Sequence, residues 1–100
     1  MINWNEELKL LSGEPVVMNE KPASLRTCVI NALGAGFEDE RQLDGEEKLK
    51  RFKLSMKLFN DENFCPNSSD VELMKKCVAK AYPAGLCGLI WIRLDPKLAE

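Results

Sequence analysis

The chain has 100 residues, with 14 lysines and arginines, 16 aspartates and glutamates and no histidine, which gives a formal net charge of −2. This length fits one small domain with a single core, and the charge argues against general affinity for nucleic acid. The absence of histidine removes the commonest general base and metal ligand. We therefore expect that the protein is not an enzyme.

The N-terminal region has the pattern of a short β-hairpin. Residues 7–11 alternate apolar with polar side chains, Ser12-Gly13 is a turn signal, and residues 15–18 are β-prone. We predict a hairpin over residues 7–18 with these two segments as its strands, followed by a loop at 19–22. Because an isolated hairpin is only marginally stable in water, this one must pack on helices.

The first helix is predicted over residues 24–33. Ser24 can cap its N-terminus, and Gly34 and Gly36 end it. Its apolar residues share one face at helical spacing. The charged segment 38–42 that follows is expected to be a solvated connector.

The second helix is predicted over residues 45–59. Asp44 can cap it, and Glu47 stands three residues later, where it completes a capping box. Large apolar residues recur at spacings of 3, 4 and 3, and we expect this stripe to face the core. Its members are Leu49, Phe52, Met56 and Phe59.

Two more helices are predicted, over residues 70–82 and 84–94. Ser69 and Glu72 form the capping box of the third helix, and Pro83 suits the start of the fourth. The apolar segment 84–94 also fits a central strand, although its length favours a helix. Even as a helix it is too short to span a membrane, which takes about 20 residues.

Together these elements predict an α+β fold, with an N-terminal β-hairpin packed on a bundle of three to four helices in a single domain, residues 1–100. The expected core consists of Leu25, Val29, Leu33, Leu49, Phe52, Met56, Val71, Met74, Val78, Leu89 and Trp91.

Cysteine spacing argues against a metal site. The four cysteines, at positions 28, 65, 77 and 87, include no CxxC pair. The interhelical loop 61–72 has the length of a calcium-binding loop, but Cys65 and Pro66 occupy positions that need an oxygen ligand and a glycine. We expect no metal, no cofactor and no disulfide. The N-terminus lacks a secretory pattern, so we expect a cytoplasmic protein.

Four residues are candidates for binding a partner: Trp4, Lys50, Lys53 and Lys57. The three lysines share one stripe of the second helix and could meet an acidic surface. Trp4 lies in a polar stretch, where it either packs at the edge of the core or serves as an exposed anchor.

The layout resembles small proteins encoded by tailed phages and prophages. The resemblance is carried by the opening segment 10–17, by residues 45–54, and by residues 78–83 with the following Trp91 and Leu94-Asp95. It implies a phage context and assigns no activity or functional residue.

We expect a non-enzymatic interaction protein that binds a host or virion protein, in the host cytoplasm or in the virion. A self-associating structural or assembly component of a phage particle is the alternative. Less favoured is a nucleic-acid binder that uses the basic face of helix 45–59.

Overall fold

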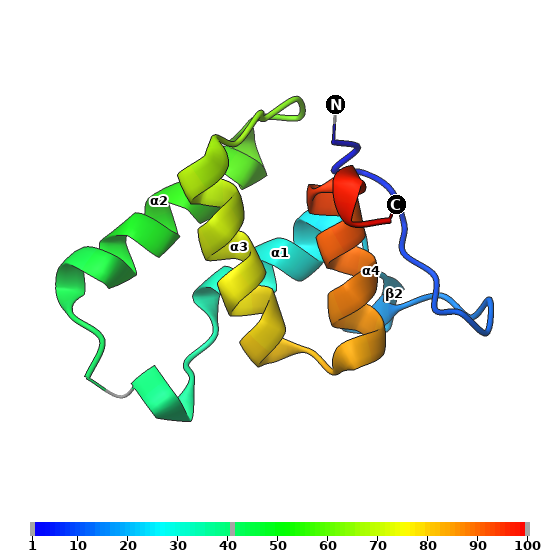
Figure 1. Cartoon of the computed structure of the whole chain (residues 1–100), viewed down its shortest axis with the longest axis horizontal. Coiled ribbons are helices and arrows are strands. Elements are labelled where there is room, and N and C mark those ends of the chain that lie inside the picture. Colours follow the sequence, from blue (N-terminus) through cyan, green and yellow to red (C-terminus); the bar gives the residue numbers. More distant parts are fainter. Residues whose placement is uncertain (1, 41, 100) are drawn as a thin grey trace.

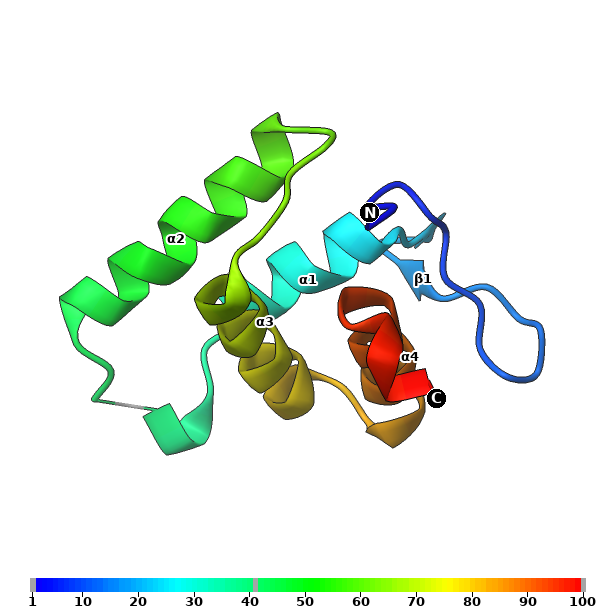
Figure 2. The same ribbon diagram turned by 45° about the horizontal axis from the view of Figure 1, so that its top comes forward.

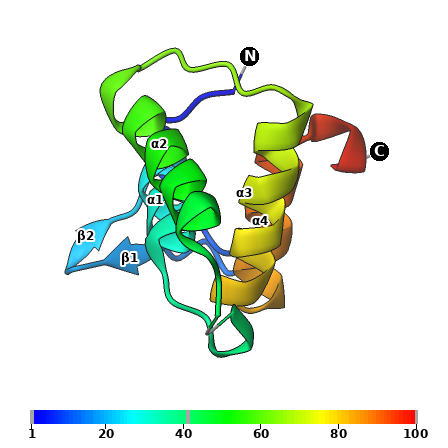
Figure 3. The ribbon, with the colours of Figure 1, turned by 90° about the vertical axis from the view of Figure 1, so that its left-hand side faces the viewer.

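Helix α1 (Leu25–Gly34) is the element on which α2 (Gly45–Asn60) and α3 (Ser68–Ala81) both pack. This computed structural model describes residues 2–40 and 42–99. α1 passes behind α3, with α2 at one edge of the molecule (Figure 1). α3 and α4 (Ala84–Leu94) lie side by side, and α2 stands apart from them (Figure 3).

The predicted α+β class is confirmed: a two-stranded antiparallel hairpin precedes four helices in the described chain. Two short 3₁₀ turns complete the order, η1 (Glu38–Glu40) before α2 and η2 (Pro96–Ala99) after α4. The segment 84–94 is the helix α4 and not a strand.

The regular strands lie one turn later than expected. β1 (Val17–Met18) lies at the end of the second predicted strand. It pairs with β2 (Lys21–Pro22), which lies within the segment that we predicted as a loop. The predicted pairing of 7–11 with 15–18 is reduced to a bridge between Lys9 and Pro15 with flanking hydrogen bonds. The turn between the strands holds Asn19 and Glu20 at φ of 52° and 67°. Such turns usually carry glycine, so Glu20 gave no turn signal in the sequence.

The N-terminal segment holds the start of α1. The backbone N–H of Leu25 donates to the Glu6 carbonyl at 2.9 Å, and that of Arg26 donates to the Trp4 carbonyl at 3.0 Å. The Ser24 side chain accepts from the Thr27 N–H, which confirms the predicted cap. These bonds satisfy amide groups that a helix start leaves unpaired.

α3 begins two residues earlier than predicted. Asn67 is its cap, with its side chain accepting from the Asp70 N–H at 2.8 Å while the Asp70 carboxylate accepts from the Asn67 N–H at 3.2 Å. The predicted box of Ser69 with Glu72 is therefore wrong. Asn and Ser are comparable caps, and the earlier box adds helical residues at the N-terminus.

The predicted facing of α2 is wrong. Leu49, Phe52, Met56 and Phe59 are exposed by 50, 60, 46 and 74%, whereas the buried residues of the helix are Arg51, Leu54 and Leu58. α2 carries two stripes at helical spacing, and the stripe of smaller side chains faces α1. The larger residues point to solvent.

The remaining core agrees in part with expectation. Leu25, Val29, Leu33, Met74 and Val78 are buried as predicted. Val71, Leu89 and Trp91 are only partly buried and pack against the core from outside. The buried stripe of α4 consists instead of Leu86, Ile90 and Leu94.

Truncating a side chain on the buried face of α2 should destabilise the fold far more than truncating one on the exposed face. Leu58 is fully buried, so Leu58→Ala should lower the free energy of unfolding by about 3 kcal/mol. Phe52→Ala removes an exposed side chain and should change it by about 0.5 kcal/mol or less. Urea unfolding of the parent and of both variants measures these changes in the free energy of unfolding. An equal or larger loss for Phe52→Ala would show that the outward face of α2 is wrongly assigned.

Candidate functional site

The outward face of α2 exposes four large apolar side chains, which we call the outer stripe: Leu49, Phe52, Met56 and Phe59. Residues three and four apart are neighbours on a helix surface, so the four form one continuous strip. α2 lies at the edge of the molecule in both views of Figure 1 and Figure 2. Exposed apolar patches rimmed by polar residues commonly mark interaction sites.

Lysines border the outer stripe on both sides. By the 3.6-residue helical period, Lys50, Lys53 and Lys57 lie on one margin and Lys48 on the other. All four are exposed. None of them makes an ion pair with a described side chain, whereas Arg51, Lys75, Lys76, Lys80 and Arg93 all do. Residues 48–57 include five basic side chains and no acidic one.

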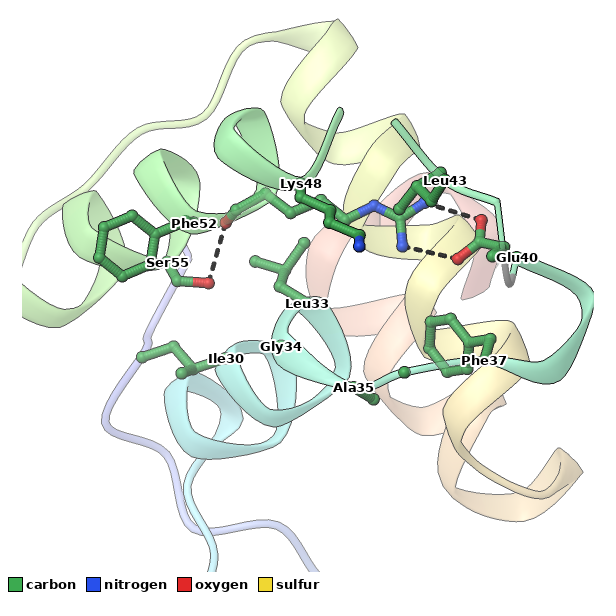
Figure 4. A pocket seen from close by; sticks show the side chains of 12 residues that line it. Ile30, Leu33, Gly34, Ala35, Phe37, Glu40, Leu43, Lys48, Phe52 and Ser55 are labelled. Atoms are coloured by element: carbon green, nitrogen blue, oxygen red, sulfur yellow. Dashed lines mark hydrogen bonds and ion pairs between the residues drawn. The ribbon is translucent and has the colours of Figure 1, made fainter. Parts of the chain in front are cut away.

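A cavity of about 680 Å³ opens beside the outer stripe, between α1, the segment 34–43 and α2. Its walls are mainly apolar, from Ile30, Leu33, Phe37, Leu43 and Phe52. Lys48 and Leu33 project into this space from opposite helices (Figure 4). Phe52 therefore belongs both to the cavity wall and to the outer stripe.

A second hollow, of about 570 Å³, lies on the other margin near the C-terminal end of α2. Lys53, Met56 and Lys57 line it together with Asp61 and Phe64. The outer stripe is thus a ridge with a hollow on each side.

A buried ion cluster forms one wall of the 680 Å³ cavity. The Glu40 carboxylate accepts two hydrogen bonds from the Arg51 guanidinium, at 2.7 and 2.8 Å, and lies 2.9 Å from Lys80 Nζ. The side chains of Arg51 and Glu40 are only 4 and 8% exposed. Segment 38–42 was expected to be solvated, and for Glu40 this is wrong. The cluster ties η1 to α2 and α3.

Hydrogen bonds from Arg51 and Lys80 lower the pKa of Glu40 from 4.5 to about 2, against a smaller opposing effect of burial. The same carboxylate raises the pKa of Arg51. Glu40 is therefore ionised at neutral pH, and its oxygens are occupied by cations. A carboxylate with so low a pKa holds no proton for a general acid and is a weak general base at neutral pH.

Trp4 is a core residue and not a surface anchor. It is 1% exposed, its Nε1–H donates to the Phe64 carbonyl at 2.7 Å, and its ring stacks on Phe64 with centroids 6.4 Å apart. The structure therefore separates Trp4 from the candidate lysines, which stay on the surface of α2. It instead brings the lysines together with the outer stripe, which sequence reasoning placed in the core.

Within 2–40 and 42–99, no group of three or more His, Cys, Asp or Glu side chains converges to hold a metal ion. In the same ranges no helix is both long and apolar enough to cross a membrane.

Comparisons with protein-family models, curated proteins and solved structures find no match to this chain. Function is therefore inferred from the surface of α2.

The low pKa of Glu40 makes a testable contribution to stability. Glu40→Gln removes the carboxylate that hydrogen-bonds to the buried Arg51 guanidinium and leaves only Glu47, 3.5 Å from its Nε, so it should cost about 3 kcal/mol at neutral pH. A carboxyl whose pKa falls on folding stabilises the fold above its unfolded pKa and loses that effect as the pH falls through its folded value. The gap between parent and variant should therefore shrink from pH 4.5 toward about 2.

Unfolding free energies across this pH range test the prediction. The control is Glu62→Gln, because Glu62 is exposed and its side chain makes no ion pair with a described residue. A pH-independent gap for Glu40→Gln would contradict the assigned ion cluster.

Thiol reactivity should follow burial. Cys65 is exposed in the loop before α3, Cys87 is half-buried, and Cys28 and Cys77 are buried; all four are free thiols. Burial raises the pKa of Cys28 to about 11 and also raises that of Cys77 and Cys87, which disfavours their reactive thiolates. A thiol reagent should label Cys65 first, Cys87 more slowly, and the buried pair only on unfolding. Cys65→Ser should remove the fast phase alone; fast labelling of Cys28 in the native protein would contradict the fold.

Proposed function

We propose that this chain is a non-enzymatic binding protein that engages a protein partner through the outer stripe of α2. The observation that carries this proposal is the exposure of four large apolar side chains on one helix face, beside two hollows. Apolar and aromatic side chains supply most of the binding energy in protein interfaces, while a charged rim sets specificity. The lysines on both sides of the outer stripe, which we call the lysine margins, occupy the position of such a rim.

The class of partner is proposed from the sequence. The resemblance to tailed-phage and prophage proteins favours a host or virion protein, met in the host cytoplasm or in the particle. The outer stripe is suited to such a role because its side chains are available without unfolding any part of the core.

Self-association in a phage particle is a second candidate. It is favoured by one observation: the outer stripe keeps the 3-4-3 spacing of a helical seam and is not used by the core of this chain. In this case the partner is another copy of α2.

Removing the outer stripe should abolish capture of the partner. The immobilised parent protein is compared with Phe52→Ser/Met56→Ser in pull-downs from a host lysate and from a virion extract. A partner retained by the parent should fall at least about tenfold with the double variant, which corresponds to about 1.4 kcal/mol. Leu11→Ser is the matched control, because Leu11 is a fully exposed apolar residue far from α2 in sequence.

Circular dichroism establishes that both variants keep the parental helix content. Equal retention by the double variant and the parent would overturn the proposed function, since binding would then not use the outer stripe.

A further inference from the structure

We propose that the partner presents an acidic amphipathic helix, which lies along α2 with its apolar residues on the outer stripe and its carboxylates on the lysine margins. This inference rests on the proposed function and adds the chemistry of the partner. It follows from the shape of the surface, its charge, and the consequences of pairing α2 with itself.

The shape of the surface favours a helix over an extended strand. The outer stripe runs from Leu49 to Phe59, a rise of about 15 Å along α2. The backbone groups of α2 are bonded within the helix, so an extended strand would find no sheet edge to pair with. A ridge between two hollows is instead the surface that packed helices use, because side chains of one helix enter the grooves of the other.

The cavity can hold a bulky side chain of the partner. Phe52 forms its wall on α2, and Leu33 and Phe37 contribute further apolar walls. Aromatic anchors in such hollows are frequent hot spots. Lys48 lines the same cavity (Figure 4), where it can pair with a carboxylate next to the anchor.

The charge of the surface favours acidic residues on the partner, because Lys50, Lys53 and Lys57 outnumber the two acids that line a hollow with them, Glu46 and Asp70. Four lysines border the outer stripe without a described carboxylate partner, while the buried Arg51 is neutralised by Glu40. Bringing an apolar helix onto the outer stripe would partly desolvate these lysines. A partner with Asp or Glu on both sides of its apolar face compensates for this and accelerates the encounter.

A second copy of this chain lacks that complement. In an antiparallel pair of α2 helices, the margin of Lys50, Lys53 and Lys57 would face the same margin of the other copy. In a parallel pair it would face Lys48. Glu46 lies near the margin of Lys50, Lys53 and Lys57 and offsets one of its charges, but the lysines outnumber it, so both arrangements bring an excess of like charge together.

An anionic lipid surface is also attracted by lysines around an apolar stripe. The hollows on both sides of the ridge favour a peptide, because each has room for a single side chain of a partner helix.

Selection from a displayed library of random peptides tests the inference. One selection uses the parent protein and the other Lys50→Glu/Lys53→Glu/Lys57→Glu. The parent should enrich peptides with apolar residues at helical spacing flanked by Asp and Glu, and the variant should enrich basic peptides with the same apolar spacing. An enriched acidic peptide should bind the triple variant at least tenfold more weakly and lose affinity for the parent as salt rises.

The matched control is Lys9→Glu/Lys21→Glu/Lys97→Glu, which makes the same change in net charge at three exposed lysines outside α2. It should bind the acidic peptide within about twofold of the parent at moderate salt, where distant charges are screened. Equal losses in both triple variants would overturn the inference, because net charge and not the lysine margins would then govern binding.

Other outcomes separate this inference from the proposed function. If the enriched peptides lack acidic residues but still lose binding to Phe52→Ser/Met56→Ser, the inference fails and the proposed function stands. If no enriched peptide depends on the outer stripe, and the parent instead sediments with phosphatidylglycerol vesicles or binds single-stranded DNA, both fail. A dimer in sedimentation that Phe52→Ser/Met56→Ser dissociates would assign the outer stripe to self-association and overturn the inference.

Discussion

The bond between Arg51 and Glu40 sets the orientation of α2, and the surface of the molecule follows from it. A guanidinium that is 4% exposed is strongly destabilising without a carboxylate, and Glu40 meets it with two hydrogen bonds from a turn eleven residues earlier. With Arg51 inward, the helical period also brings Leu54 and Leu58 inward. Phe52 and Met56 must then point to solvent. One ion pair thereby selects which of two apolar stripes forms the core.

The chain combines an exposed apolar face with a charge pattern that discourages its use by identical copies. Four large apolar residues on one helix face are an aggregation hazard. Lysines on both margins oppose the approach of a second α2. Their charge helps to explain how the exposed apolar face of α2 can be tolerated on the free protein.

Local patterns predicted the helices but misplaced the strands, and contacts distant in sequence decided which face of each helix is buried. The Ser24 cap and the helical segment 84–94 follow from neighbouring residues alone. The orientation of α2 does not follow from neighbouring residues, because both of its stripes have helical spacing. The stripe with the larger apolar side chains was therefore predicted to face the core. Burial of Trp4 depends on the Phe64 carbonyl, sixty residues away. The candidate lysines were recognisable from sequence, but the stripe and hollows beside them required the orientation of α2.

The cavity beside Phe52 owes its space to the residues that end α1. Gly34, Ala35 and Gly36 line it and bring almost no side-chain volume, and a Cβ added at either glycine would meet nothing within 4 Å. In the sequence these glycines indicated only the end of a helix. In the fold they also leave space unfilled between α1 and α2 at this end, while Glu40 and Arg51 form part of the same cavity's wall. Helix termination and the shape of the proposed binding surface therefore come from the same short segment.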